Sequence, residues 1–310
     1  MRKTVLTAFA VLGTGVAVAL STGLSTAQPK AASWQQVGDD IKSGISGLTV
    51  TSRSGDNLRT LVVRDNKKPG ENRIAEATYR PGQAAEVSPI SWHGSAEPKD
   101  LEALDAVPGT SDEFVALASR GLAYHLKLTD AGEAVQVLDI APLPAIGTDD
   151  NFESFSLTSR HGETAAVWAD RGEGEDRPAT LYAAPFSISS YGEAQFGPVD
   201  KATFRAPYPE GDVRHASDIE VTKSGRLLVS SASDAGDDGP FDSAVSDAGK
   251  LSISSEGEVR LSVAESPEVL EKFDGHKIEA LRCAPGSHLA ALGTDNENTG
   301  GALTTRRLCD

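Results

Sequence analysis

The chain has 310 residues and a formal net charge of −16, and 39% of its residues are hydrophobic. This length allows one large domain or two small ones, with enough apolar residues for a folded core. The excess of acidic groups argues against nucleic acid and anionic membrane surfaces as partners, because both attract clustered Lys and Arg. The two cysteines form no C-x-x-C pair, which excludes zinc fingers and iron–sulfur clusters.

The first residues have the pattern of a secretory signal peptide. Arg2 and Lys3 precede an apolar run from Val5 to Leu20, and small residues lead to a cleavage point after Ala27. The run is shorter than the roughly 20 apolar residues of a membrane-spanning helix, although an uncleaved anchor is the alternative. We expect a secreted, extracellular protein with a signal peptide over 1–27, a flexible leader over 28–40 and a single domain over 41–310. No membrane insertion is expected after cleavage.

The mature chain contains an internal repeat. A short motif of apolar, acidic, small and apolar residues recurs, with variations, as Ile45-Ser46-Gly47-Leu48, Leu101-Glu102-Ala103-Leu104, Phe152-Glu153-Ser154-Phe155, Ile219-Glu220-Val221 and Ile278-Glu279-Ala280-Leu281. Each copy is followed by a turn and an apolar strand, at 61–63, 114–118, 165–169, 227–230 and 289–293. Polar clusters containing Asp, Asn, Ser or Arg end these strands, and further strands follow in several copies.

Short strands separated by Gly, Asp and Pro predict an all-β fold. Four strands in each unit, repeating every roughly 50 to 70 residues, are typical of the blades of a β-propeller. We therefore expect five or six four-stranded blades, a sixth being hidden in Glu86–Lys99 or Glu193–Glu210. A β-sandwich is the alternative. Only Ser266–Phe273 has a pattern that predicts a short helix.

The repeated glutamate is expected to face the central channel, because the innermost strand of each blade lines it. Successive side chains on a strand alternate between faces, so the glutamates of the four copies would occupy equivalent positions around the axis, namely Glu102, Glu153, Glu220 and Glu279. Carboxylates that share a partly buried site need cations, raised pKa values or hydrogen bonds from backbone N–H groups.

Three interpretations of these carboxylates stay open. They could form a structural latch with backbone N–H groups or with Arg120 and Arg171. They could hold Ca²⁺, which takes six to eight oxygen ligands, with Glu153, Glu279 and Asp295 as the candidate metal ligands. They could also contact a ligand directly, together with the residues that end the neighbouring strands, Asp170, Arg171, Asp295 and Asn296.

Residues of two copies resemble a known family. His276–Leu281 with Gly293–Asn298, and Asn151–Phe155 with Trp168–Gly172, resemble the secreted propellers called phytase-like, or "esterase-like activity of phytase". The resemblance extends from about residue 41 to 308. It implies a propeller fold and hydrolysis of phosphoesters or related esters. The dense carboxylate lattice of calcium-dependent propeller phytases is not evident in this sequence.

Two cysteines in an exported chain suggest one disulfide, between Cys283 and Cys309. On the chain-entropy model such a bridge contributes roughly 3–4 kcal/mol. The alternative, a reactive thiol, needs a nearby base, and the local sequence supplies none.

Searches for catalytic motifs find no G-x-S-x-G elbow, no H-E-x-x-H and no phosphate-binding glycine loop. Two functions therefore stand beside each other. The first is a binding module with an acidic central channel that recognises a small molecule or a protein and requires no cofactor. The second is a Ca²⁺-dependent hydrolase of phosphoesters or esters, which the acidic charge disfavours because it repels phosphate. Whether the protein is an enzyme stays open, and we expect a monomer.

Overall fold

The computed structural model describes Met1 and residues 33–310. Apart from Met1, the expected signal peptide lies outside the described residues. In the described range the regular structure consists of β-strands and two short 3₁₀ turns, η1 (Ile41–Ser43) and η2 (Glu297–Thr299). No helix in that range is long and apolar enough to cross a membrane.

The strands follow one another as antiparallel sheets. The first contains β2 (Gly47–Ser54), β3 (Asn57–Val63), β4 (Ile74–Tyr79) and β5 (Glu86–His93), and the second β6 (Leu101–Ala106), β7 (Glu113–Ala118), β8 (Leu122–Leu128) and β9 (Ala134–Pro142). The third contains β10 (Phe152–Arg160), β11 (Glu163–Asp170) and β12 (Ala179–Ile188), with β13 (Ala194–Phe196) and β14 (Asp200–Phe204) both paired to β12. The fourth sheet contains β15 (Val213–Val221), β16 (Arg226–Ser233), β17 (Asp242–Ile253) and β18 (Val259–Asp274). The fifth contains β19 (Ile278–Cys283), β20 (Ala290–Thr294), β21 (Ala302–Arg306) and β1 (Gln35–Gln36). Outer strands β5 and β9 also pair in parallel.

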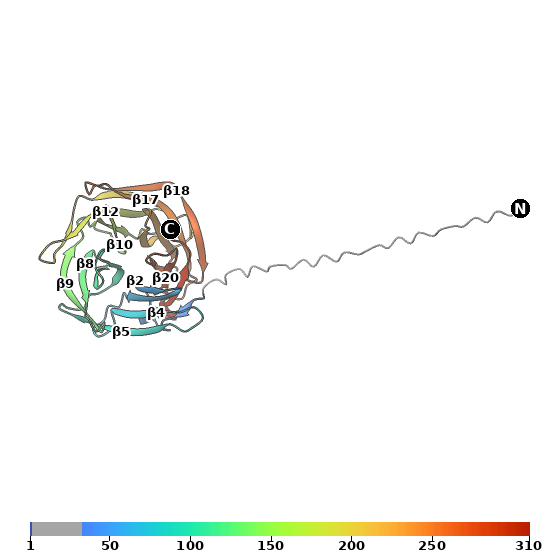
Figure 1. The fold of residues 1–310 in the computed structure, drawn as a ribbon, viewed down its shortest axis with the longest axis horizontal. Helices are drawn as coiled ribbons and strands as arrows, with labels where there is room; N and C mark the ends of the chain where they lie inside the picture. Colours follow the sequence, from blue (N-terminus) through green and yellow to red (C-terminus); the bar gives the residue numbers. More distant parts are fainter. Residues whose placement is uncertain (2–32) are drawn as a thin grey trace. The chain divides into compact units, whose positions relative to one another are not determined.

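These sheets form a closed ring. The inner strands β2, β6, β10, β15 and β19 each contact the next one, and β19 contacts β2 again. In Figure 1, β2 and β10 lie near the centre of the ring, whereas β5, β9 and β18 lie at its periphery. Residues 33–310 are therefore a five-bladed β-propeller, as the repeat predicted. The segments considered for a sixth blade instead supply β5 to the first blade and β13 and β14 to the third.

The ring is closed by strand β1 from the start of the described chain. Gln35 pairs with Leu303 of β21, and its side-chain amide donates to the carbonyl of Arg80 at 2.6 Å. The boundary expected at residue 41 is thus wrong, because the propeller already includes Gln35 and Gln36. A two-residue edge strand takes its register from the partner's backbone, so it carries no apolar pattern that sequence analysis can detect.

The core lies between neighbouring blades. Leu181 of the third blade belongs to one cluster with Ile219 and Val229 of the fourth, and a similar aliphatic layer joins the fifth and first blades. The cluster between the second and third blades is instead rich in aromatic residues, among them Phe155 and Trp168. The inner strands approach closely: a Cβ at Gly47 would lie only 2.6 Å from Cα of Ala103, so the first copy of the motif needs glycine there. Medium-sized side chains suit the aliphatic interfaces, and the few aromatic residues of the chain gather mainly between the second and third blades.

The helix expected over Ser266–Phe273 is wrong. These residues form the second half of β18, where Val269 pairs with Ser246 and Phe273 with Ser243 of β17. The weak helical pattern is overridden because β17 offers a partner along its whole length, and tertiary pairing routinely outweighs local propensity.

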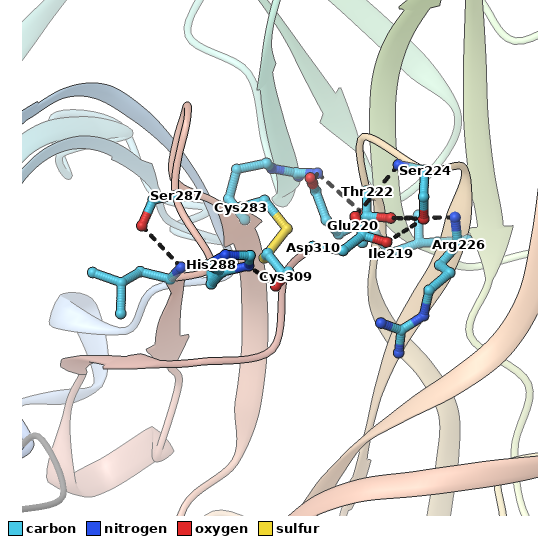
Figure 2. The surroundings of a disulfide bond; sticks show 12 residues. Ile219, Glu220, Thr222, Ser224, Arg226, Cys283, Ser287, His288, Cys309 and Asp310 are labelled. Carbon is cyan, nitrogen blue, oxygen red and sulfur yellow. Dashed lines mark hydrogen bonds and ion pairs between the residues drawn. A yellow bond between two sulfur atoms is a disulfide. The ribbon is translucent and has the colours of Figure 1, made fainter. Parts of the chain in front are cut away.

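The structure confirms the predicted disulfide. Cys283, at the end of β19, is bonded to Cys309, and their Cα atoms are 5.9 Å apart. Figure 2 shows the bridge beside Asp310, whose carboxylate reaches across to Ser224 in the turn between β15 and β16. The bridge and this contact fasten the segment after β21 to the fourth and fifth blades.

Candidate functional site

Three inner strands begin with the same irregularity. In β6 the pairing with β7 shifts between Leu101 and Ala103, and β10 and β19 shift at the equivalent positions. A bulge leaves one residue unpaired and redirects its side chain. That residue is Glu102, Glu153 or Glu279, and each of these lines a recess at the mouth of the channel.

The recess has a volume of about 170 Å³ and, among the described residues, a lining of polar and charged side chains. Its acidic members are Asp65, Asp100, Glu102, Glu153, Glu279, Asp295 and Glu297, its basic members are Lys67, Arg171, Arg214 and Lys277, and Asn151 completes it. Each blade except the fourth contributes at least one carboxyl group. Carboxyl groups therefore outnumber cations, and the recess has an acidic surplus.

Ion pairs within the lining neutralise part of this charge. Arg214 Nη1 lies 3.2 Å from Glu153 Oε1 and 3.1 Å from Glu279 Oε1. Arg171 Nη1 approaches Glu153 Oε1 at 2.9 Å, and Lys277 Nζ approaches Glu279 Oε1 at 2.9 Å. The pairing with Arg171 is the one considered from the sequence, whereas Arg120 forms no ion pair within the described range.

Two carboxyl groups are left incompletely partnered. Glu153 is only 4% exposed, and its buried Oε2 has no hydrogen-bond partner among the described residues. No Lys or Arg of the described chain lies within ion-pair distance of Glu102. Burial, followed by the charge of Glu153, raises the pKa of Glu102 well above its ordinary value. Glu153 Oε2 is thus an acceptor without a partner in the described range, and Glu102, whose side chain hydrogen-bonds to Asp100, has no cationic partner there.

Neighbouring carboxyl groups differ in acidity. Burial outweighs the attraction of Lys277 and raises the pKa of Glu279 to about 8. Burial, with the charge of Asp65, raises the pKa of Asp295 to about 7. Although burial opposes it, hydrogen bonds from Lys67 and Ser119 hold the pKa of Asp100 below its ordinary value.

The candidate metal ligands do not converge on one point. Glu153 and Glu279 both face Arg214, while Asp295 Oδ1 accepts a hydrogen bond of 2.9 Å from the backbone of Glu297. Within the described residues, no three His, Cys, Asp or Glu side chains are arranged to hold a metal ion. Arginine and lysine side chains supply positive charge beside these carboxylates, as the latch interpretation with Arg171 considered.

Two other predicted residues fasten loops rather than line the recess. Asp170 accepts hydrogen bonds from Arg177 Nη1 at 3.0 Å and from the backbone of Asn151 at 3.0 Å. Asn296 Oδ1 accepts from the backbone N–H of Lys277 at 2.8 Å. Both side chains hold polar segments near the mouth in place.

The equivalence assumed for Glu220 is wrong. Phe152, the first residue of the third copy, donates its backbone N–H to a carbonyl of the preceding blade, and Ala216 does the same. Ala216 is therefore the first residue of the fourth copy, and Ser217 stands at the position of the glutamate. The residues that match the motif in the sequence, Ile219-Glu220, lie three residues further along the strand than Ala216-Ser217. Glu220 therefore sits deeper in the channel than Glu153.

The deeper layer is organised by Arg282, which is 3% exposed. Its guanidinium donates to Glu220 Oε2 at 2.8 Å and lies 3.6 Å from the carboxylates of Asp105 and Asp218. It also donates to one backbone carbonyl on each of the other four inner strands, those of Leu48, Leu104, Phe155 and Ile219. Arg282 thus spans the channel beneath the recess and joins all five blades.

A signal for part of the missed lining was present in the sequence. Asp100, Asn151 and Lys277 each stand two residues before a channel glutamate, and residues i and i+2 of a strand share a face. Arg214 and Arg282 follow no repeated pattern, because each occurs in one blade only. The sequence therefore suggested the acidic groups of the site and concealed most of its cations.

The buried carboxyl groups predict a stability that falls as pH rises. Burial raises the pKa of Asp218 to about 7 and that of Glu220 to about 8, despite the attraction of Arg282. Asp and Glu titrate near pH 4 in the unfolded chain, so the folded state binds more protons between pH 4 and 8, and the free energy of unfolding decreases across that window. Each proton that the folded state binds in excess of the unfolded state lowers the free energy of unfolding by about 1.4 kcal/mol per pH unit.

Urea denaturation at pH 5, 6, 7 and 8 measures this slope. The variant Asp295→Asn is expected to show a shallower decline, because it removes one raised carboxyl while the amide oxygen can still accept from Glu297. If the free energy of unfolding increases from pH 5 to pH 8, the folded protein does not keep its channel carboxyl groups protonated in that range.

Comparisons with known proteins add no family assignment. Neither a protein-family model nor a curated protein matches the chain. Among solved structures, a putative exo-β-1,3-galactanase from Bifidobacterium bifidum has a TM-score of 0.48 at 10% identity, over 91% of this chain and 94% of that one. A GH43 β-1,3-galactosidase with galactodeoxynojirimycin has a TM-score of 0.47 at 10% identity, over 89% and 94%. The GH62 α-L-arabinofuranosidase domain of Coprinopsis cinerea has a TM-score of 0.46 at 13% identity, over 91% and 100%. The fold assignment rests on the closed ring of strands described above.

Proposed function

We propose that the protein is a secreted, monomeric binding module whose channel mouth takes a small polar ligand. The observation that carries this proposal is Glu153, a residue of the recess lining whose buried Oε2 has no hydrogen-bond partner in the described structure. An unsatisfied buried acceptor costs about 1–3 kcal/mol, and a donor from a ligand recovers that free energy. Secretion is supported by the signal-peptide pattern and by the Cys283–Cys309 bridge.

The shape of the channel supports binding rather than passage. Arg282 spans the channel below the recess, so a ligand that enters from the mouth meets a closed floor. The lining of the recess offers acceptors on several blades and no apolar wall. A ligand suited to this place is small, hydrophilic and rich in hydrogen-bond donors.

A thermal-shift screen of small polar compounds tests the proposal. A ligand at 100 times its Kd stabilises the folded state by about 2.7 kcal/mol, which raises the melting temperature measurably. We expect the shift to disappear in Glu153→Gln and to persist in Glu258→Gln, which changes an exposed glutamate of the β17–β18 turn. If no compound shifts the wild type more than Glu153→Gln, the mouth is not a binding site.

A second candidate function is hydrolysis, as the phytase-like resemblance implies. It is favoured by Asp100 and Glu102, adjacent carboxyl groups whose pKa values are displaced in opposite directions, because such pairs divide the roles of base and acid. In this alternative Ca²⁺ neutralises channel carboxylates and activates water.

An activity screen separates the two functions. It covers aryl phosphates, esters and glycosides, the last because carboxyl pairs also cleave glycosidic bonds, each with and without millimolar Ca²⁺. Binding alone predicts no turnover. Turnover that depends on Ca²⁺ and is lost in Glu102→Gln, Glu153→Gln and Glu279→Gln would replace the binding proposal with the hydrolase.

A further inference from the structure

We propose that the ligand of the channel mouth is a primary ammonium group on a slender alkyl chain, held between the carboxylates of Glu102 and Glu153. This inference rests on the proposed binding function and specifies the chemistry of the ligand. The ammonium belongs either to a free amine or to a lysine side chain of a partner, and the two sources share the same contacts.

The first argument is the distribution of charge in the recess. Each of its cations already contacts a carboxylate: Arg214 and Arg171 contact Glu153, Lys277 contacts Glu279 and Glu297, and Lys67 contacts Asp100 at 2.8 Å. Among the described residues, none of them contacts Glu102. A cationic guest removes the remaining acidic surplus, whereas an anionic guest would add to it.

The second argument is the position of the open acceptors. Both hydrogen bonds to Glu153 from the recess arginines end on Oε1, at 2.9 and 3.2 Å, and the buried Oε2 has no partner among the described residues. Glu102 occupies the same bulge position on β6 as Glu153 does on β10, and these inner strands are neighbours in the ring. Both carboxyl groups belong to the lining of the same small recess. An ammonium has three donors and can bond to both.

The third argument is the size and kind of cation. A volume of 170 Å³ is below the range of roughly 300–1,000 Å³ of pockets for drug-sized ligands, so the guest is small and narrow. Calcium needs six to eight converging oxygen ligands, and the described residues offer no such cluster. An alkylammonium needs only two or three acceptors, and the side chains of Glu153 and Glu102 can supply them.

Isothermal titration calorimetry at a pH of about 8.5 and low salt tests the inference, since more carboxyl groups are then charged. The probes are 1,4-diaminobutane and Nα-acetyl-lysine methylamide. Their neutral counterparts are 1,4-butanediol and Nα,Nε-diacetyl-lysine methylamide, and CaCl₂ is titrated separately. We expect both ammonium probes to bind and the neutral ones not to bind. Affinity should fall at least tenfold in Glu102→Gln and in Glu153→Gln, and should be unchanged in Glu258→Gln. Melting curves show whether each variant is folded.

The outcomes distinguish this inference from the function on which it rests. Binding of both ammonium probes supports the shared chemistry, and binding of the lysine derivative alone supports it with a protein partner as the source. If butanediol binds as well as the diamine and needs Glu153, the binding function stands and the ammonium class is wrong. Binding of CaCl₂ alone also overturns the inference, and so does diamine binding that survives both substitutions. If a wider screen likewise finds no ligand, the proposed function fails as well.

Discussion

Replacing Arg282 with methionine is expected to lower the free energy of unfolding by about 3–5 kcal/mol, the usual cost of breaking a buried ion pair by removing one partner. The substitution leaves Asp218 and Glu220 buried without their counter-charge. It also removes the donor for a carbonyl on each of the other inner strands, where an unsatisfied buried acceptor is costly. The loss should be larger at pH 8 than at pH 5, because protons can replace the missing positive charge under acidic conditions.

Urea denaturation of two further variants gives this prediction its controls. Arg260→Met removes an exposed ion pair with Glu258 and is expected to cost less than about 1 kcal/mol. Adding Glu220→Gln to Arg282→Met should recover part of the loss, because it removes one of the stranded carboxylates. A cost for Arg282→Met no greater than that for Arg260→Met would show that the arginine does not join the blades.

The double variant Cys283→Ser, Cys309→Ser is expected to lose about 3 kcal/mol of stability. The bridge closes a loop that contains β20 and β21, so its removal increases the conformational freedom of the unfolded fifth blade. This blade also carries β1, the strand that completes the ring, and the loss should therefore lower the cooperativity of unfolding. Urea denaturation of the oxidised protein, the reduced protein and the variant measures the effect.

Two controls accompany the disulfide prediction. Intact-mass measurement with and without reductant reports whether the bridge is formed in the purified protein. Asp310→Asn perturbs the neighbouring contact with Ser224 while leaving the bridge intact, and it is expected to change stability by less than about 1 kcal/mol. Equal stability of the oxidised protein and the double variant would contradict the structural role assigned to the bridge.

The repeat was sufficient to predict the propeller because the inner strand of each blade meets the same packing requirement. An apolar residue, a channel residue, a small residue and another apolar residue satisfy the close contact between inner strands, and this requirement leaves a visible pattern at Leu101–Leu104 and Ile278–Leu281. Blade number was ambiguous because outer strands such as β5 and β13 are half-exposed and follow no strict pattern. Strand β1 was missed for a similar reason.

The site was less predictable than the fold. Three channel glutamates could be found because they recur, and the structure brings Glu102, Glu153 and Glu279 together at one mouth. The assignment of the fourth glutamate, Glu220, was wrong because the bulge in β15 is longer than those in the other inner strands. The residue equivalent to the glutamate is Ser217, although Ile219-Glu220 resembles the motif more closely. Arg214 and Arg282 break the symmetry of the ring, and a residue that occurs in one blade only leaves no periodic signal.

This asymmetry is also what makes the recess specific. A symmetric ring of glutamates would need a metal ion to neutralise its charge. In this channel, Arg214 and Lys277 instead neutralise the side of the mouth near Glu279. The side near Glu102 keeps its acidic surplus. The arrangement therefore directs a cationic group toward one pair of blades, the second and the third.

The most direct test is a crystal structure of the protein grown with 1,4-diaminobutane at a pH of about 8.5, where more carboxyl groups are charged than at neutral pH. We expect five inner strands closed around Arg282 and an ammonium nitrogen within hydrogen-bonding distance of the carboxylates of Glu102 and Glu153. Glutamate side chains turned to bulk solvent, or a recess that holds only water in crystals saturated with the diamine, would contradict this expectation.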